Sequence, residues 1–243
     1  DGASPNQNKE MVIPILYSCY SRENSYKPIV QDNLYVLDES KKKLQINFSS
    51  REKKAPVLSI FRRFSSPVIW ESDLSIDDYL FLFLNDNDYF TRWDSCQFLM
   101  RKIIKTRIIN KANHLLEHSF IFTIRQSIKS LEINDPLFLS TLLTIPGFAE
   151  LESLFEKVDP INIYRESLNF QALIGNEIFN ELATLSKSLF ANINHEWPIG
   201  KGERKLLGTI WSYLALVGDR NVQKNCVELI SHSSMTIARA ALG

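Results

Sequence analysis

The sequence predicts a mainly α-helical protein in which a small antiparallel β-sandwich portion is followed by an irregular α-superhelix. Two observations support this fold class. Between residues 11 and 70 the apolar runs are short and rich in β-branched and aromatic residues, which is typical of strands. After Trp70 the apolar residues recur at helical spacing, and helix-start signals appear repeatedly. We therefore expect a partial, Ig-like β-sandwich domain over residues 1–70 and an α-helical superhelical domain over residues 71–243.

The strand predictions depend on four apolar runs separated by polar turns. In the third run Leu44, Ile46 and Phe48 alternate with polar residues, as in a strand with one buried face. The polar connector Asp38–Lys43 indicates a turn. The four runs are Met11–Tyr17, Asn33–Leu37, Lys43–Phe48 and Pro67–Trp70. Because a complete sandwich has about seven strands in ~100 residues, this β unit is expected to be incomplete.

The first helices are predicted from their start signals. Ser75 followed by Asp78 resembles a capping box in which Asp replaces the usual Glu or Gln. Asp135–Pro136 and Asp159–Pro160 each place an N-cap acid before a proline at the first helical position, where the missing N–H loses no hydrogen bond. The segment from Asp88 to about Ile109 carries apolar residues near one face, which favours a long helix.

The later helices follow similar signals. Gly147 and Gly218 stand where helices can end with a positive φ angle. Apolar stripes predict helices over residues 160–190 and 203–217. We expect about eight or nine helices joined by short loops. The spacing of the helix pairs favours a HEAT- or armadillo-like helical array over a compact bundle, although no strict repeat is visible.

Composition and charge argue against several classes of partner. The 28 basic residues balance the 28 acidic ones, so we expect no nucleic acid and no anionic membrane held by bulk charge. No stretch approaches the ~18 apolar residues of a membrane span. Cys19, Cys96 and Cys226 lack C-x-x-C spacing, which favours reduced thiols and a cytoplasmic location. The polar start, Asp1–Lys9, has neither an initiator Met nor the apolar core of a signal peptide, and it is typical of a fragment.

The string His114–His118 is the strongest candidate for a metal site. It reads H-x-x-E-H, the inverted zinc-protease motif, in which two His ligands lie one helical turn apart. Glu196 follows at a distance suited to a third ligand. However, residues 110–113 read as a loop and Glu196 lies in a loop-like stretch. We therefore interpret the string as the polar first turn of an apolar helix.

No other residue set has the pattern of a site. His195 and His232 are isolated from other ligand types, and the chain lacks a G-x-S-x-G elbow and a Gly-rich phosphate loop. The pairs Lys53–Lys54 and Arg62–Arg63 are interpreted as a solvated edge, in keeping with the neutral charge balance. The residues alone assign no catalytic, cofactor-binding or metal-binding position.

Two segments have a more specific pattern. Ala55–Val68 reads APVLSIFRRFSSPV, and Asp88–Gln97 reads DYFTRWDSCQ. Together they resemble the joint of the aminopeptidase N family, in which P-x-x-S-L-L-R-G-F-S-A-P-V closes a β-sandwich and a D-x-F-x-R-W-[DE]-x-x-Q helix opens the C-terminal superhelix. The bacterial alanyl aminopeptidase branch is the most similar in spacing, and Leu142–Pro146 and Leu154–Ile161 resemble two of its further segments. The similarity extends from about residue 10 to the end, and Arg63 stands where the family usually has Gly.

The resemblance implies that the chain is the non-catalytic C-terminal portion of a zinc-dependent aminopeptidase, a metallopeptidase that removes N-terminal residues from peptides. The family's H-E-x-x-H zinc helix, its M-E-N strand and its oxyanion-stabilising Tyr all precede the joint. The chain contains neither H-E-x-x-H nor M-E-N. No catalytic residue can therefore be carried over, and the chain alone is predicted to be inactive and without cofactor, whereas zinc is implied for the parent enzyme.

The resemblance also implies partners and a role. The partners would be the N-terminal and catalytic domains of the same protein and the peptide substrates of the parent enzyme, with the superhelix as a wall of the peptide-binding chamber. The superhelix would continue beyond Gly243 if the chain is truncated there. Two other hypotheses stay open. One is a stand-alone helical-repeat module that binds a protein partner. The other is a self-contained metalloprotease that uses His114, Glu117, His118 and Glu196.

Overall fold

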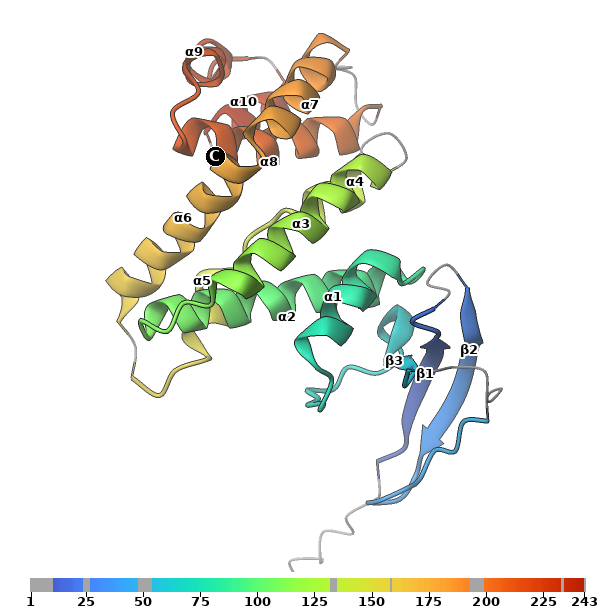
Figure 1. Cartoon of the computed structure of the whole chain (residues 1–243). Coiled ribbons are helices and arrows are strands. Elements are labelled where there is room, and N and C mark those ends of the chain that lie inside the picture. Colours follow the sequence, from blue (N-terminus) through green and yellow to red (C-terminus); the bar gives the residue numbers. More distant parts are fainter. Residues whose placement is uncertain are drawn as a thin grey trace, which may run out of the picture. The chain divides into compact units, whose positions relative to one another are not determined.

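The structure is a computed structural model that describes residues 11–23, 27–47, 54–131, 135–157, 159–192, 199–232 and 234–242. The chain divides into two compact units, Asp1–Asp94 and Ser95–Gly243. The first unit holds a small antiparallel sheet, and the second consists of helices (Figure 1). The predicted fold class, mainly α with a small antiparallel β portion at the start, is confirmed.

The sheet of the first unit has three strands in the order β2-β1-β3. β1 (Ile13–Tyr20) is the central strand and pairs antiparallel with both β2 (Pro28–Leu37) and β3 (Val57–Ser59), as Figure 1 shows. The β1–β2 register has irregularities between Tyr17 and Tyr20. The last four residues of β1 are buried, whereas β2 has no buried residue, so the covered part of the sheet lies at the end of β1.

Two of the four strand predictions are wrong. Residues 43–47 and 67–70 have no regular secondary structure, and Phe48 lies outside the described residues. Alternation of apolar and polar residues predicts which face of a strand is buried, but a strand also needs a partner for its N–H and C=O groups. Within the described residues, neither segment pairs with β1, β2 or β3.

The joint region of the first unit continues with a short 3-10 helix, η1 (Arg62–Phe64), and the helix α1 (Ile76–Asn85). The predicted capping box is confirmed, because the Ser75 side chain accepts from the Asp78 N–H and the Asp78 side chain accepts from the Ser75 N–H. α1 packs toward the sheet through Leu82, which forms a buried cluster with Tyr20 and Val57.

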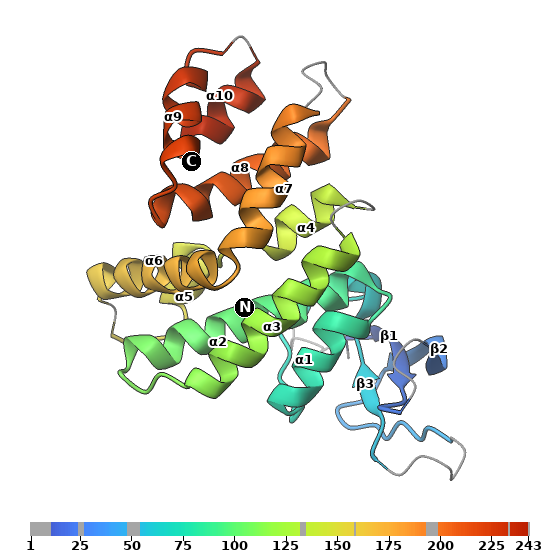
Figure 2. The same cartoon turned by 45° about the horizontal axis from the view of Figure 1, so that its top comes forward.

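The helix α2 (Tyr89–Ile108) runs across the division between the units and confirms the long helix predicted there. Ten α-helices occur in the described residues, rather than the eight or nine expected, because short helices such as α5 were not predicted. The helices after α2 are α3 (His114–Leu131), α4 (Pro136–Leu142), α5 (Phe148–Glu152), α6 (Pro160–Glu177), α7 (Phe179–Ala191), α8 (Lys201–Leu216), α9 (Arg220–Leu229) and α10 (Met235–Leu242). Figure 2 shows α7 crossing α8, with α9 and α10 beside the same end of the helical unit.

Local signals predicted some helix ends correctly. The side chains of Asp135 and Asp159 accept backbone N–H groups at the starts of α4 and α6, as predicted. Gly218 follows α8 with φ of 87°, also as predicted. Gly147 is different, because it is the N-cap of α5 with φ of −67° rather than the end of a helix. The apolar stripe over 160–190 belongs to two helices, which meet at the fully buried Ile178.

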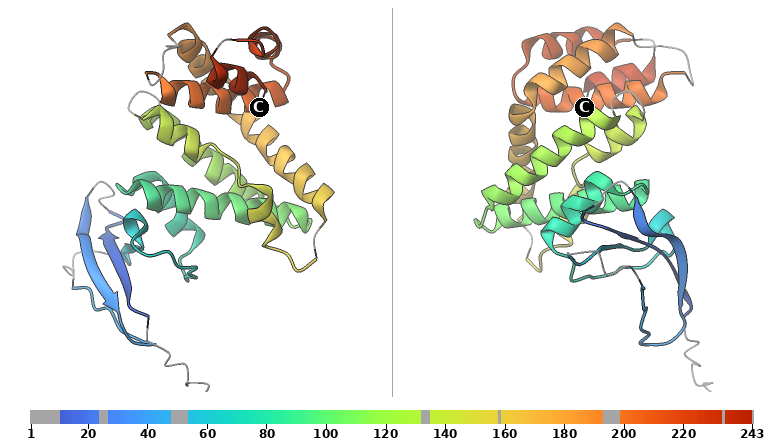
Figure 3. Two further views of the ribbon diagram at one scale, coloured as in Figure 1. Left: turned by 180° about the vertical axis from the view of Figure 1, so that it is seen from behind. Right: turned by 45° about the vertical axis from the view of Figure 1, so that its right-hand side comes forward.

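α8 carries several fully buried side chains and packs against α4, α6, α7, α9 and α10. The Trp211 indole N–H donates to Ser186 Oγ at 2.9 Å, which ties α8 to α7. The two views of Figure 3 show α7, α8, α9 and α10 together at one end of this unit. Because the interior of the unit consists of these pairwise helix contacts, it is an array and not a bundle around one axis.

The C-terminal end of α4 explains why the segment Leu142–Pro146 is distinctive. Helices leave their last carbonyls without intrahelical partners. Here the Leu143 carbonyl accepts from the Tyr213 hydroxyl at 2.6 Å, and the Thr144 carbonyl accepts from Gln97 Nε2 at 3.0 Å. Burial raises the pKa of Tyr213 far above its ordinary value, so this donor keeps its proton. α2 and α8 are thus joined through the end of α4.

Candidate functional site

The His114–His118 string lies in the first turns of α3, which begins at His114. Glu117 is 4% exposed, whereas the side chain of His114 is 81% exposed. His118 is also exposed. Glu196, the proposed third ligand, lies outside the described residues. Of the candidate ligands in the string, the glutamate is therefore the one that is buried.

Glu117 is held by an arginine on the preceding helix. Its Oε1 lies 2.7 Å from Arg107 Nη1, and its Oε2 lies 3.1 Å from His114 Nδ1. Arg107 Nε is 3.4 Å from Glu166 Oε2 on α6. Glu117 is in the first turn of α3 and Arg107 in the last turn of α2, where each charge favours its helix dipole. The string thus joins α2, α3 and α6 by ion pairs, which is a sufficient structural reason for it.

The described residues do not fit the zinc implied for the parent enzyme. Nowhere in the described part of the chain do three His, Cys, Asp or Glu side chains come together as metal ligands would. His232 Nδ1 accepts from the Ser234 N–H at 2.9 Å, and His195 lies outside the described residues. Cys19, Cys96 and Cys226 are thiols, and burial raises the pKa of Cys226. None of the described helices is long and apolar enough to cross a membrane.

The interpretation of Arg62–Arg63 as a solvated edge is wrong for Arg62. This residue is 1% exposed, and its guanidinium lies 2.5 Å from Asp86 Oδ1 and 2.8 Å from Asp32 Oδ1. The same guanidinium also donates to Asn87 Oδ1. Arg63 is 68% exposed at its side chain and, among the described residues, forms an ion pair with Asp32, so it agrees with the prediction. Lys54 is exposed, and Lys53 lies outside the described residues.

Tyr20 completes the cluster around Arg62. Its hydroxyl lies 3.0 Å from Asp86 Oδ1 and 3.0 Å from Asn87 Oδ1. Burial, reinforced by the Asp86 charge, raises the pKa of Tyr20 to about 12. Burial alone would lower the pKa of Arg62, but the Asp86 charge and the hydrogen bonds to Asp32 and Asp86 outweigh it and raise that pKa. Both groups are therefore locked in their protonated forms, which suits a structural joint and not proton transfer.

Sequence reasoning missed this cluster because its members are far apart in the chain. Asp32 and Asp86 lie thirty positions before and twenty-four after Arg62. One local signal was present, since Arg62 and Arg63 stand between the apolar residues Ile60–Phe61 and Phe64. A charged residue inside an apolar run is often buried with a partner of opposite charge.

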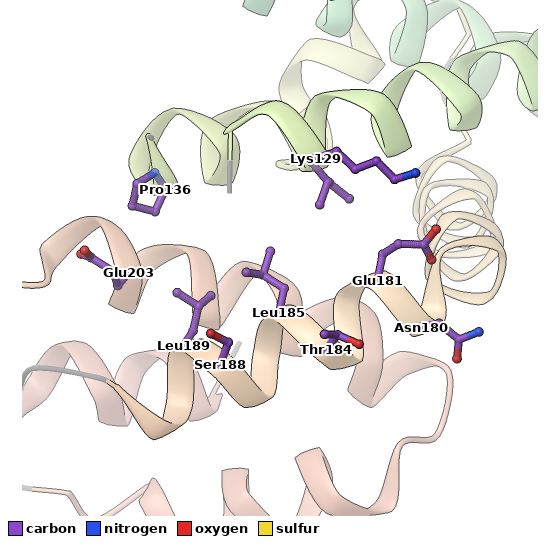
Figure 4. A pocket seen from close by; sticks show the side chains of 10 residues that line it. Lys129, Pro136, Asn180, Glu181, Thr184, Leu185, Ser188, Leu189 and Glu203 are labelled. Carbon is purple, nitrogen blue, oxygen red and sulfur yellow. The ribbon is translucent and has the colours of Figure 1, made fainter. Parts of the chain in front are cut away.

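A groove in the helical unit is the best candidate for a binding surface. It encloses about 650 Å3 and is lined by residues of α3, α4, α7 and α8. Figure 4 shows Lys129 and Pro136 on one side and Glu181, Leu185 and Leu189 on the facing side. An apolar floor with polar groups at the rim is typical of pockets that bind peptides or small molecules.

The charged groups of this groove are placed by its own walls. Arg125 Nε on α3 lies 2.6 Å from Glu181 Oε1 on α7, and an Arg125 Nη2 donates to the Glu177 carbonyl at 2.6 Å. These contacts join α3 to the end of α6 and the start of α7, and they hold the Glu181 side chain at the edge of the groove. Lys129, one helical turn after Arg125, is exposed at the opposite rim. The groove thus offers the exposed ammonium of Lys129, which can pair with a carboxylate of a peptide, and the Arg125–Glu181 ion pair on its other side.

Comparisons with known protein families match nearly the whole chain. Residues 2–73 match a domain of unknown function, DUF3458, with an Ig-like fold, and residues 76–243 match a second one, DUF3458_C, described as ARM repeats. These descriptions agree with the predicted order of an Ig-like β portion followed by an armadillo-like array.

The individual proteins to which the chain is similar are named as aminopeptidases. The chain is 27% identical over 176 residues to aminopeptidase N of Caulobacter vibrioides, covering 72% of this chain and 18% of that protein. It is 27% identical over 197 residues to aminopeptidase N of Escherichia coli, covering 77% of this chain and 22% of that protein. The fold matches the crystal structure of Legionella pneumophila aminopeptidase A in complex with aspartic acid, with a TM-score of 0.80, 22% identity, and coverage of 97% and 28% of the two chains. The chain spans about a fifth of the length of the two aminopeptidase N relatives.

Proposed function

The chain belongs to the DUF3458 family of Ig-like and ARM-repeat domains of bacterial aminopeptidase N homologues, and from this membership we propose that it walls the peptide chamber of a zinc aminopeptidase. The parent enzyme would remove N-terminal residues from peptides, and this chain would supply no catalytic group. The groove between α3 and α7 is the single observation that supports this role most strongly, because it offers a peptide-sized, mixed apolar and charged surface.

The proposal includes the cofactor, partners and location of the parent enzyme. Zinc would be held by the domains that precede this chain, since the described residues provide no ligand cluster. Those domains would be its partners within the same protein. The three thiols support a reducing, cytoplasmic location, where disulfides seldom persist.

The role in substrate binding can be tested in the enzyme encoded by the complete coding region. Ser188 lines the groove on α7 and is exposed, so Ser188→Trp would fill the groove without disturbing the core. We expect KM for an octapeptide to rise about tenfold, while the kcat/KM for a single-residue substrate such as alanine p-nitroanilide stays unchanged. Lys224→Trp, at an exposed position on α9 outside the groove, is the matched control.

Two results would contradict the proposal. One is a coding region that encodes neither H-E-x-x-H nor M-E-N upstream of residue 1, because the parent would then not be a zinc aminopeptidase. The other is an equal effect of Ser188→Trp and Lys224→Trp on both substrates, because the groove would then not contact peptides.

A further inference from the structure

The segment between η1 and α1 has one face that the described residues leave uncovered. It consists of residues 67–71, which have no regular secondary structure and belong to the first unit (Figure 1). Ile69, in its middle, is fully exposed. A single exposed apolar side chain is common on protein surfaces, so Ile69 alone does not indicate an interaction.

The backbone around Ile69 is the second observation. The Val68 N–H donates to the Ser66 carbonyl at 3.0 Å, and the Leu74 N–H donates to Ser72 Oγ at 3.1 Å. Between these two bonds, the N–H and C=O groups of residues 69–71 have no hydrogen-bond partner in the described part of the chain. A row of free N–H and C=O groups is what the edge of a sheet offers to an added strand.

The side chains of the segment alternate as they do in a strand. Val68 and Trp70 are half-buried, and the Trp70 ring lies 5.6 Å from the Phe61 ring. Their neighbours on either side are exposed, Ile69 among them. Because successive side chains of a strand point to opposite faces, this alternation gives the segment one face that packs on its own unit and one face that is free to be covered.

The segment lies in the Ig-like part of the chain. The Ig-like family model matches residues 2–73, and the ARM-repeat model begins at residue 76. A complete Ig-like sandwich has about seven strands in two packed sheets. In the described residues three strands occur, in one sheet. Residues 67–71 thus belong to an Ig-like domain and pair with none of its described strands.

We propose that residues 67–71 are the docking edge for an extended strand of the polypeptide that precedes this chain in the parent enzyme. The inference rests on the proposed function, because that function supplies the preceding domains. Main-chain hydrogen bonds of residues 69–71 give the pairing its affinity, and the added strand covers Ile69. A strand of the same protein is favoured over a second copy, because the connecting polypeptide keeps it at a high effective concentration.

The exposed face also specifies the chemistry of the added strand. Ile69 and Glu71 are two residues apart, so they share this face. Glu71 is exposed and forms no ion pair with any residue that the structure describes. A matching strand therefore carries an apolar residue opposite Ile69 and a lysine or arginine opposite Glu71, the cross-strand pairs that stabilise a sheet.

Hydrogen exchange measured by mass spectrometry tests the proposal in the complete protein and in the 243-residue chain. In the 243-residue chain we expect the amides of residues 69–71 to exchange at the rate of an unpaired loop. In the complete protein their exchange should be slower by about tenfold or more, because a paired amide exchanges only when its hydrogen bond opens.

Two variants separate strand pairing from other causes of protection. Ile69→Asp places a charge on the face to be covered, and in the complete protein it should return the exchange of residues 69–71 to within about twofold of the rate in the 243-residue chain. It should leave the Tm of the 243-residue chain unchanged, because Ile69 is fully exposed there. Val227→Asp, the same kind of change at an exposed position of α9, is the matched control and should leave exchange of residues 69–71 slow.

The outcomes distinguish this inference from the proposed function. Fast exchange of residues 69–71 in a complete protein that cleaves peptides would overturn the inference and leave the proposed function standing. Slow exchange in a complete protein without zinc or peptidase activity would support the inference and contradict the proposed function. Protection that survives Ile69→Asp would overturn the strand pairing. Protection in the 243-residue chain that grows with protein concentration would identify a second copy as the occupant and would also overturn the proposal.

Discussion

At the scale of single residues, the buried charges of this chain hold elements together. Glu117 is buried beside Arg107, and Arg62 is buried beside Asp86. A buried charge is destabilising unless it is paired and hydrogen-bonded. Both sites meet this condition with partners that are distant in sequence or on another helix. Glu117, the acid of the H-x-x-E-H string, therefore has a structural role as an ion-pair partner of Arg107.

The adjacent residues Arg62 and Arg63 should respond to substitution in opposite ways. Arg62→Met would leave Asp86 buried without its cation and should lower the free energy of unfolding by about 3–5 kcal/mol. Arg63→Ala loses only an exposed ion pair with Asp32 and should change it by less than about 1 kcal/mol. Urea denaturation of the two variants measures the difference, and equal effects would contradict the assignment of Arg62 as the buried partner.

Arg63 also has the backbone conformation that glycine prefers. Its φ is 53° and its ψ is 26°, a left-handed conformation that is unfavourable for side chains with a Cβ. The resemblance to the aminopeptidase N family placed a Gly at this position. The chain therefore places a residue with a Cβ in a backbone conformation that glycine adopts without strain.

The stability of the first unit should fall between pH 10 and pH 12. Tyr20 has a raised pKa of about 12 in the folded protein, against 10.0 when unfolded. Between these values the unfolded chain releases the proton and the folded chain keeps it, so stability is complete below pH 10 and is lost as pH rises. The loss from this residue amounts to up to about 2–3 kcal/mol. Tyr20→Phe should be less stable at pH 7 and show a shallower decline, and an unchanged slope in urea titrations at each pH would refute this.

At the scale of elements, the sequence correctly predicted helix starts, which depend on neighbouring residues. It failed to predict strands and helix breaks that depend on residues distant in the chain. The caps at Ser75, Asp135 and Asp159 were predicted because each lies within three residues of the N–H it accepts. The strand expected at 43–48 is absent from its described part, residues 43–47, because a strand requires a neighbour that the pattern cannot supply. The break at Ile178 was missed because the apolar stripe continues through it, and burial of its side chain between α6 and α7 marks the corner.

The close approach of α8 and α10 should make Gly208 sensitive to a single added methyl group. Gly208→Ala would bring its Cβ to 2.9 Å from Ala240 Cβ and 3.1 Å from Ala240 Cα. We expect a loss of about 1–3 kcal/mol in the free energy of unfolding, despite the better helix propensity of alanine. In a double-mutant cycle Ala240→Gly should recover part of this loss. Additive effects of the two substitutions would show that the helices do not touch there.

At the scale of the whole molecule, the fold class and the family could be predicted from the sequence, but the candidate site could not. The fold class can be predicted from the spacing of apolar residues. The family can be predicted from two short segments of the chain, one around residue 63 and one around residue 92. The groove, in contrast, joins Lys129 of α3 to Glu181 of α7, which are more than fifty residues apart. No spacing rule relates such positions, because the loops and short helices between them set the geometry.

The measurement that tests the central claim most directly is the zinc content and peptidase activity of the purified 243-residue chain, beside those of the complete enzyme. We expect that the isolated chain, with a helical circular dichroism spectrum, retains no zinc after dialysis against a weak chelator and cleaves no peptide, whereas the complete enzyme retains zinc and cleaves peptides. One zinc retained per chain, with activity that is lost in His118→Ala, would contradict it and restore the His114–His118 string as an active site.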